Sequence, residues 1–479
     1  MFDVMIIGAG VIGSAVAREL SRYQLNIGVI EKNLDVCNEG SGRNSAVIHG
    51  GFAYDIGSNK AKFCVEGCLG FEALSKELDI PFKQTGKVLV GNTDEDYERL
   101  LDTIKTGKIN GSVGLRMIDK NELKEMVPAV NGEFAMFSPL SGIVDPFVYT
   151  IALAENACAN GVTYFFDNEV TEIIDEETGY YRIVTTKDEF QTKWVINCAG
   201  LNCVAISEML GITGYEIGGT KGDYIVLDKN VGSLLPMPVY PVPTNTYMGI
   251  HVTPTIDGNV TVGPNSVQVE DRTYYGVPKT HMTYLAEDAS TLWPHIHKKD
   301  YIRNYAGIQP TWKDRESTIK DYVIEVREAN PNVVNLIGME SPGLTSAVPI
   351  ARHVVKLVAE QEELTIKADF NPTRKGILKF SEQSDSVKAE LIEKDPDYGE
   401  IICRCETVTK AEILEAIHNP LGVDTMLGIK YRTRAMMGRC QGGYCQMRIA
   451  KLIQEEKEKQ ATEVIYCRPA SQLFTGKVK

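Results

Sequence analysis

The strongest constraint on the fold of this 479-residue chain is a glycine-rich turn close to its N-terminus. The turn, Gly8-Ala-Gly10-Val-Ile-Gly13, follows an apolar run at residues 4–7 and precedes a helical pattern at residues 15–20. Gly8 permits the tight turn, Gly10 lets the backbone approach a pyrophosphate, and Gly13 lets the helix pack closely on the strand. The sequence therefore predicts a Rossmann-like α/β unit with a phosphate group at the start of its helix.

A second apolar run, at residues 27–30, ends at Glu31. This carboxylate is placed to accept a hydrogen bond from a ribose hydroxyl, which completes the fingerprint of a dinucleotide-binding domain. The fingerprint alone does not separate FAD from NAD.

The composition predicts a folded chain of two or three domains, since 43% of the residues are hydrophobic and 24% are charged. A net charge of −14 and the lack of a basic stripe argue against nucleic acid as a partner. The chain opens directly on a strand-like run, and no apolar run reaches eighteen residues, so we expect a cytoplasmic protein without a membrane span. Its eleven cysteines are better interpreted as reduced thiols and metal ligands than as disulfides.

The stretch 41–51, SGRNSAVIHGG, resembles the segment that flavoenzymes of the D-amino-acid oxidase superfamily lay beside the isoalloxazine ring. Segments 195–200, 249–265 and 338–346 extend the resemblance as a second FAD-contacting strand, a substrate-domain hairpin and a strand-to-helix turn. The resemblance implies FAD as the cofactor. The residues expected to contact it are Gly8, Gly10, Gly13, Glu31, Lys32, Ser41, Arg43, Asn44, Ser45, Val170, Ala199, Gly200, Gly307, Gly343, Leu344 and Thr345.

The same resemblance implies an α/β fold for residues 1–365, in which a Rossmann-like FAD-binding domain is interleaved with a mixed-sheet substrate domain. The FAD-binding segments are expected at 1–80, 145–210 and 330–365. In the substrate domain, alternating apolar residues predict strands at 224–227, 247–254 and 259–262.

The C-terminal part of the chain is expected to form a small helical domain. Residues 366–398 are polar and charged and predict a linker or short helical connection, and residues 456–479 a tail. Within the domain, at 399–455, helices are predicted at 410–417 and after residue 445.

Four cysteines in this domain, Cys403, Cys405, Cys440 and Cys445, predict a metal centre. Four thiolates suit a 2Fe-2S cluster or a closed zinc site, and unmetallated thiols are the third interpretation. The run GRCQGGYC and the cysteine spacing resemble the cluster domain typified by bacterioferritin-associated ferredoxin, which implies the 2Fe-2S cluster. Basic residues in the same segment, such as Arg404, either stabilise an anionic cluster or form a solvated face.

A flavin domain followed by a cluster domain is similar to the large subunits of anaerobic glycerol-3-phosphate dehydrogenases. The resemblance implies hydride transfer from a secondary alcohol to FAD and single-electron transfer through the cluster. The chain holds no terminal acceptor, so we expect a partner, either a second flavoprotein or a small electron carrier, and the substrate is expected to be a small anionic hydroxy compound.

Two histidines are candidates for the base that takes the hydroxyl proton, because a histidine pKa suits proton transfer at neutral pH. They are His49 and His251, two of only seven histidines, and both lie in motifs of the resemblance. Lys60 resembles a substrate-proximal lysine, although a surface position is the alternative. Candidates for contact with the substrate are Tyr54, Arg303, Lys313 and Arg315.

Two departures weaken glycerol 3-phosphate as the substrate. Gln309 stands where related enzymes often carry arginine, and Phe52 and Ala53 follow the paired glycines where glycerol-3-phosphate enzymes tend to have arginine. A second hypothesis is therefore an L-2-hydroxyglutarate or other 2-hydroxy acid dehydrogenase. A third is an electron-transfer subunit without a substrate of its own, and a zinc-only C-terminal domain would instead act as a docking module.

Overall fold

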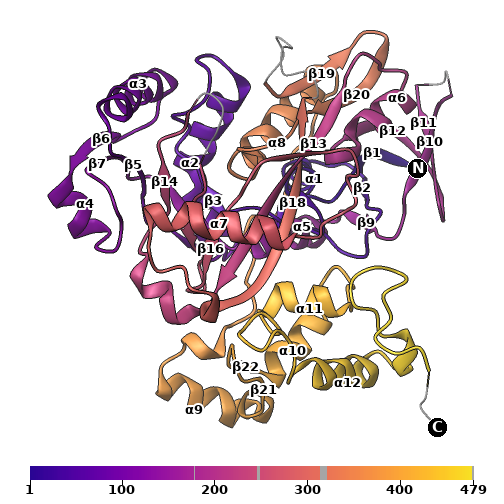
Figure 1. Ribbon diagram of the computed structural model, residues 1–479. Coiled ribbons are helices and arrows are strands. Elements are labelled where there is room, and N and C mark those ends of the chain that lie inside the picture. The colour runs from indigo at the N-terminus through magenta and orange to yellow at the C-terminus, as the bar shows by residue number, and fades with distance from the viewer. Residues whose placement is uncertain (177–178, 245–248, 313–320, 477–479) are drawn as a thin grey trace.

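The computed structural model of the protein describes residues 1–176, 179–244, 249–312 and 321–476. Figure 1 shows the two sheets of residues 1–365 side by side and the helices of the C-terminal domain packed below them.

The first sheet is built around parallel strands in the order β9-β2-β1-β12-β20, which confirms the Rossmann-like domain. Side chains of β1 alternate between its two faces, with Val4 and Ile6 in one hydrophobic core and Met5 and Ile7 in another. The parallel strands are β1 (Phe2–Ile7), β2 (Ile27–Ile30), β9 (Thr163–Phe165), β12 (Glu189–Asn197) and β20 (Asn330–Ile337). Antiparallel strands β10 (Val170–Asp175), β11 (Tyr181–Thr185) and β19 (Val323–Arg327) extend the sheet.

Helices cover both faces of this sheet, as its two apolar faces require. One face packs against α1 (Val11–Leu20), α2 (Asn59–Glu77), α5 (Pro146–Ala159) and α8 (Gly343–Ala359). The other face packs against α6 (Cys203–Met209). A small sheet of β3 (Val47–Ile48), β8 (Gly142–Val144) and β4 (Phe82–Lys83) carries the chain between the two domains.

The second sheet has the order β17-β13-β16-β15-β14-β5-β7-β6, with β18 also paired to β13. It is mixed as expected, because β14 and β5 are parallel whereas its other pairs are antiparallel. Its strands are β5 (Lys87–Gly91), β6 (Arg116–Asp119), β7 (Phe134–Ser138), β13 (Ile217–Leu227), β14 (Val239–Pro241), β15 (Val252–Pro254), β16 (Val260–Val262), β17 (Val267–Val269) and β18 (Tyr301–Trp312). Helices α3 (Asp94–Asn110), α4 (Lys120–Met126) and α7 (Lys279–Leu292) complete this domain.

The predicted strands at 224–227 and 259–262 correspond to parts of β13 and to β16. The strand predicted at 247–254 is shorter than expected, because residues 249–251 are irregular and β15 begins at Val252. Residues 247 and 248 lie outside the described residues. Gly249 has a positive φ of 78°, which an extended strand does not allow.

The C-terminal domain has the helical character expected from the sequence. Its elements are α9 (Asp385–Lys394), β21 (Ile401–Cys403), β22 (Val408–Thr409), α10 (Lys410–Ile417), α11 (Met426–Thr433) and α12 (Gln446–Glu456). Helix α10 has the predicted bounds because Thr409 and Glu412 form a capping box at its start. Helix α11 was not predicted.

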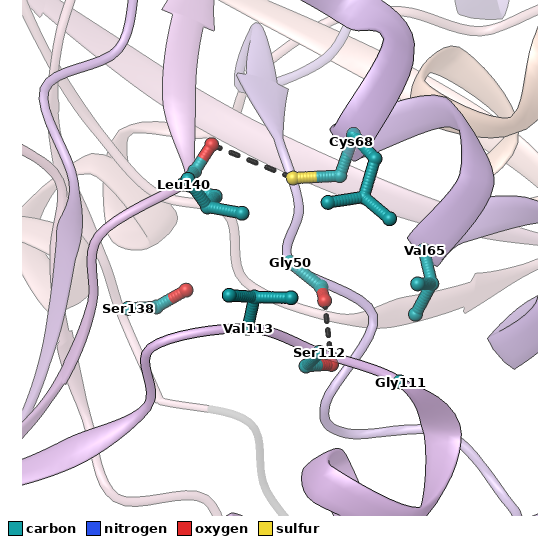
Figure 2. Close-up of a pocket in the computed structure, with 9 residues that line it drawn as sticks. Gly50, Val65, Cys68, Gly111, Ser112, Val113, Ser138 and Leu140 are labelled. Carbon is teal, nitrogen blue, oxygen red and sulfur yellow. Dashed lines mark hydrogen bonds between the residues drawn. The ribbon is translucent and has the colours of Figure 1, made fainter.

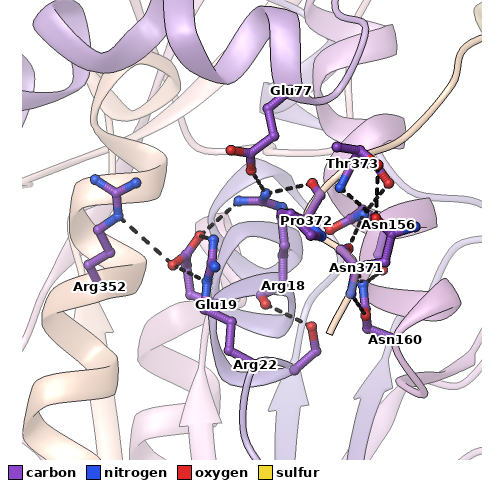
Figure 3. A network of polar contacts seen from close by, with 11 residues as sticks. Arg18, Glu19, Arg22, Glu77, Asn156, Asn160, Arg352, Asn371, Pro372 and Thr373 are labelled. Carbon is purple, nitrogen blue, oxygen red and sulfur yellow. Dashed lines mark hydrogen bonds and ion pairs between the residues drawn. The ribbon is translucent and has the colours of Figure 1, made fainter. Parts of the chain in front are cut away.

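The segment that precedes α9 is fixed against the Rossmann-like domain (Figure 3). The buried Arg18 on α1 donates to the carbonyl of Pro372 at 3.1 Å, and Asn156 on α5 donates to the carbonyls of Asn371 and Thr373 at 3.1 and 3.0 Å. Backbone groups of this polar segment are thus satisfied by side chains of the first domain. In the described part of the chain, no helix combines the length and apolarity that a bilayer crossing requires.

Candidate active site and cluster site

The glycine turn forms a cradle that leaves no room for side chains. A Cβ atom on Gly13 would lie 1.9 Å from the carbonyl oxygen of Gly8, and Gly8 itself has a φ of 104°. A Cβ atom on Gly8 would lie 2.6 Å from the carbonyl oxygen of Cys198, at the end of β12. The turn between β1 and α1 therefore brings three backbone segments to van der Waals contact, as the dinucleotide fingerprint requires.

Glu31 is buried at the end of β2, beside this cradle. Its Oε2 accepts a hydrogen bond from the Ala9 amide at 2.8 Å, and its Oε1 accepts from the Asn33 amide at 2.9 Å. Burial raises the pKa of Glu31, while these hydrogen bonds and the nearby Lys32 oppose the shift. The carboxylate is held rigidly where a ribose hydroxyl would approach.

Among the described helices of residues 1–365, α1, α6, α7 and α8 begin without a side-chain cap. Helices α2, α3 and α5 are capped by Ser58, Thr93 and Asp145, whose side chains accept from backbone amides of the first turn. The cap residues of α1 and α8, Gly10 and Pro342, provide no such hydrogen bond. Their first turns therefore suit the anionic groups of a ligand, a pyrophosphate at α1 and an electron-rich ring edge at α8.

The loop at residues 40–46 lies across the start of α1. Ser41 Oγ accepts from the Val11 amide at 2.9 Å, and the Asn44 side chain donates to the Ser41 carbonyl at 2.7 Å. Ser45 Oγ lies 3.1 Å from Tyr224 Oη, and the Arg43 guanidinium lies over the Tyr275 ring. This loop is thus held between the two domains.

The remaining predicted FAD contacts lie at the same edge of the parallel sheet. Ala199 and Gly200 follow β12, Val170 begins β10 in the hydrophobic core shared with Ile7, and Gly307 on β18 contacts the Arg43 carbonyl so closely that a Cβ would lie 1.9 Å from it. Gly343, Leu344 and Thr345 form the first turn of α8. The residues present therefore fit FAD, with a glycine cradle, a ribose-facing carboxylate and two helix N-termini facing one edge.

His49 is fixed next to α8, because its amide donates to Thr345 Oγ1 at 3.0 Å. Its Nδ1 lies 3.4 Å from Nζ of Lys87, at the start of β5. Burial, followed by the charges of Lys87 and His251, holds the pKa of His49 well below its usual range. His251 is buried and stacks on Tyr240 with ring centroids 3.5 Å apart. The structure thus brings the two predicted histidines together and adds a lysine to them.

Lys60 and Tyr54 lie in a neighbouring polar cluster. Lys60 Nζ forms an ion pair with Glu340 Oε1 at 2.6 Å, and both side chains are largely buried, so Lys60 is not a surface lysine. The Tyr54 hydroxyl is hydrogen-bonded to Ser341, and burial raises the pKa of Tyr54 well above its usual range. Gln309 Oε1 lies 3.4 Å from the Ser341 amide, so the neutral amide that replaces the expected arginine also faces this cluster.

Arg303 lies elsewhere, on an exposed part of β18 that faces the C-terminal domain. Its Nη1 is 3.5 Å from Oε1 of Gln441, the residue after Cys440. Lys313 and Arg315 fall outside the described residues. A substrate role for these three residues stays a prediction.

The four cysteines of the C-terminal domain fall into two pairs. The side chains of Cys403 and Cys445 are hydrogen-bonded to each other, and so are those of Cys405 and Cys440. Among the described residues, no three His, Cys, Asp or Glu side chains converge so as to hold one metal ion. A tetrahedral zinc site needs four ligands around one point, whereas a 2Fe-2S cluster distributes four thiolates over two irons. Two neighbouring pairs of thiolates can serve the two irons of a 2Fe-2S cluster, each of which takes two protein ligands.

A small cavity of about 10 Å³ lies behind the His49 loop (Figure 2). Gly50, Val65, Cys68 and Ser138 are among the residues that line it. A cavity of this size holds about one water molecule, so it is too small for a substrate.

Lys87 is the main site residue that the sequence did not reveal. It begins the run Lys87-Val-Leu-Val-Gly91, which is a fully buried strand in the structure. A lysine next to three apolar residues was the sequence feature that could have identified it. Tyr240 and Glu340 were also missed, because their proximity to the histidines depends on strand pairing and on the turn before α8.

Comparisons with known proteins agree with this geometry. Residues 3–357 match the family described as DAO, FAD dependent oxidoreductase, and residues 401–455 match the BFD-like 2Fe-2S binding domain. A glycerol 3-phosphate dehydrogenase of Caloramator mitchellensis is 38% identical and covers 100% of this chain and 99% of its own length. The mitochondrial L-2-hydroxyglutarate dehydrogenase of Homo sapiens is 30% identical over 76% of this chain and 90% of its own.

Among solved structures, the FAD-bound L-α-glycerophosphate oxidase of Mycoplasma pneumoniae superposes with a TM-score of 0.73 at 30% identity, covering 78% of this chain and 98% of that one. Glycine oxidase of Geobacillus kaustophilus, at 21% identity and a TM-score of 0.68, shares the fold. The chain therefore belongs to the FAD-dependent oxidoreductase family and carries a BFD-like 2Fe-2S binding domain at its C-terminal end.

Proposed function

We propose that this protein oxidises the secondary alcohol of sn-glycerol 3-phosphate to dihydroxyacetone phosphate and passes the electrons through its cluster to a protein partner or a quinone-linked acceptor. The observation that carries the proposal is the group of His49, His251 and Lys87 beside the first turn of α8. The similarity to a glycerol 3-phosphate dehydrogenase over both domains supports the same substrate.

The residues of the site would have separate tasks. Bound FAD supplies the hydride acceptor, and the cluster accepts electrons one at a time. His49 or His251 takes the hydroxyl proton, and the low pKa of His49 keeps its imidazole uncharged at neutral pH. Tyr54 and the Lys60–Glu340 ion pair border the substrate.

A 2-hydroxy acid, such as L-2-hydroxyglutarate, is the second candidate substrate. Gln309 presents a neutral amide beside Ser341, so this chain lacks a guanidinium for a bidentate phosphate contact there. L-2-hydroxyglutarate dehydrogenases also match about three quarters of the chain. The glycerol 3-phosphate dehydrogenase matches the whole chain, which is why glycerol 3-phosphate remains the leading proposal.

An anaerobic optical titration of the holoprotein separates the candidates. Bleaching of the flavin and cluster bands by sn-glycerol 3-phosphate alone would support the leading proposal, and bleaching by L-2-hydroxyglutarate alone would move the assignment to the second. If neither compound bleaches the bands while dithionite reduces both centres, both substrates are wrong. The protein would then be an electron-transfer subunit or act on another substrate.

The exposed edge of the cluster site is the proposed exit for electrons. Cys403 and Cys445 are each 1% exposed, whereas Cys405 and Cys440 are exposed, and the Arg404 guanidinium lies over the ring of the exposed Tyr444. Aromatic and arginine side chains are typical of protein interfaces. An Arg404→Glu variant, reduced with dithionite, should deliver electrons more slowly to an acidic ferredoxin but at an unchanged rate to ferricyanide. Equal rates to ferredoxin would contradict this exit.

A further inference from the structure

Lys87 is a buried cation that no carboxylate balances. Lys87 is 3% exposed, and among the described residues no acidic side chain forms an ion pair with it. The Nζ atom lies over the rings of Phe52 and Tyr240, 4.7 and 4.4 Å from their centroids. Such a position is costly for a permanent charge, and lysine is the cation that most readily loses its proton when it is buried.

Within the described residues, the nitrogen that lies within hydrogen-bond distance of Lys87 Nζ is His49 Nδ1, at 3.4 Å. The opposite ring nitrogen of His49, Nε2, remains for a substrate. An ammonium at Lys87 can only donate to Nδ1, so His49 then carries its own proton on Nε2 and cannot accept one there. A neutral amine at Lys87 has a lone pair that can accept a hydrogen bond from Nδ1–H, and in that tautomer Nε2 is free to accept a proton.

We propose that His49 and Lys87 form a proton relay, in which His49 takes the substrate hydroxyl proton on Nε2 while its Nδ1 proton passes to Nζ of Lys87. The inference rests on the proposed oxidation of a secondary alcohol. The O–H bond breaks and Nε2–H forms, and Nδ1–H breaks and Nζ–H forms. The carbon-bound hydrogen leaves with its electron pair to the flavin, so the relay handles only the proton. Lys87 is thus a positioning residue that acts through His49.

The titratable groups around Lys87 carry no charge that would keep it protonated. Cys64 and Cys68 face it from α2, Tyr240 from β14, and His49 from the segment before α2. His251, from the segment before β15, acts on His49. Burial raises the pKa values of both thiols and of Tyr240, so these groups stay neutral near pH 7. Burial also lowers the pKa of Lys87 to about 8, which places its proton exchange close to neutral pH.

Two replacements of Lys87 separate a relay from a simple attractive charge. Lys87→Arg keeps the positive charge but cannot release a proton near neutral pH, whereas Lys87→Met removes both the charge and the amine. A relay predicts that each variant reduces its flavin with substrate roughly 100-fold more slowly or worse. If the arginine variant keeps the wild-type rate, Lys87 is only a charge and the relay is wrong.

The pH profile provides a second readout. In the wild type, the rate of flavin reduction should rise with pH up to about 8, as Lys87 becomes neutral. In Lys87→Met this limb should shift to lower pH or vanish, and an unchanged limb would overturn the relay. Lys83→Met, at an exposed position on β4, is the matched control and should behave as the wild type.

A measurement without substrate keeps this inference separate from the proposed function. The pKa of His49 can be followed by NMR of histidine-labelled protein, with a His49→Gln variant to assign its signal among seven histidines. Lys87→Met should raise the pKa of His49, because a neighbouring positive charge is removed. An unchanged His49 pKa would contradict the relay even if the substrate were confirmed, whereas a raised pKa without any substrate turnover would count against the proposed function alone.

Discussion

Two ionisable side chains of this protein, Glu31 and Lys87, are buried, and the loss of solvent disfavours their charged forms. Glu31 is buried, yet four hydrogen-bonding or charge contacts from Ala9, Asn33 and Lys32 oppose the rise that burial causes in its pKa. Lys87 has no such compensation from an acidic group in the described residues, and its pKa falls instead. Burial thus shifts both pKa values toward the neutral form, and the contacts of Glu31 oppose that shift.

Glu31→Gln should weaken FAD binding about 10- to 100-fold. The variant keeps the shape of the side chain, but it loses the charge-assisted hydrogen bond to a ribose hydroxyl, which contributes about 1.5–3 kcal/mol. Titration of the apoprotein with FAD, followed by flavin fluorescence, would measure the change. Glu98→Gln, on the exposed face of α3, should leave the affinity unaltered. Equal affinities for the two variants would mean that Glu31 does not contact FAD.

At the scale of elements, the contact between α2 and α8 connects the fold to the site. A Cβ atom on Gly67, in the middle of α2, would lie 2.0 Å from the carbonyl oxygen of Thr345. Thr345 in turn accepts the hydrogen bond from the His49 amide. The glycine therefore lets α2 approach the first turn of α8, and this approach sets the position of His49.

Gly67→Ala should destabilise the protein by about 1–3 kcal/mol, because the extra methyl group overpacks a contact with backbone. Gly70→Ala, one turn later on the same helix, meets no atom within 4 Å and should stabilise the helix by about 0.5–1 kcal/mol. Denaturant unfolding of the two variants measures both effects. If the two substitutions had the same sign, the close approach of α2 and α8 would not be present in solution.

At the scale of the whole molecule, a buried ion pair fixes the cluster domain on the FAD-binding domain. Arg432 of α11 contacts both carboxylate oxygens of Asp35 at 2.7 and 3.2 Å, and both side chains are almost fully buried. Next to this pair, Tyr431 stacks on Phe147 with ring centroids 4.1 Å apart. The ion pair reaches Asp35, which leads into the loop at 40–46, so the cluster domain supports the segment that carries this loop.

Arg432→Met should cost about 3–5 kcal/mol of stability, because it leaves Asp35 buried without its partner. Replacing Asp35 by Asn in the same chain should recover most of the loss, because no unpaired charge then remains. Thermal unfolding monitored by flavin fluorescence would report both variants. For comparison, Arg99→Met removes an exposed pair with Glu95 and should change stability by less than about 1 kcal/mol. If Arg432→Met loses no more stability than Arg99→Met, the two domains are not joined by this pair.

Much of the architecture follows from local patterns. The turn at Gly8–Gly13, the strand that ends at Glu31 and the capping box at Thr409 are each specified by neighbouring residues, and each was predictable for that reason. The strand predicted at 247–254 was too long because alternation does not reveal the positive φ of Gly249. Helix α11 was missed because its buried side chains are divided between two cores, Met426 and Ile429 in its own domain and Tyr431 against the other domain.

The sequence by itself determined the kind of chemistry, because the residues that would bind the cofactors belong to recognisable motifs. These are the glycine cradle, the acidic residue after β2 and the four cysteines. Only the tertiary structure decided how the site is built. Lys87, His49 and His251 come from three separate segments, and Arg432 and Asp35 are 397 residues apart. Strand pairing and domain packing bring these groups together, and the burial that results shifts their pKa values. The spacing of residues along the chain does not reveal these contacts. It does not reveal the loss of solvent that shifts the pKa values either.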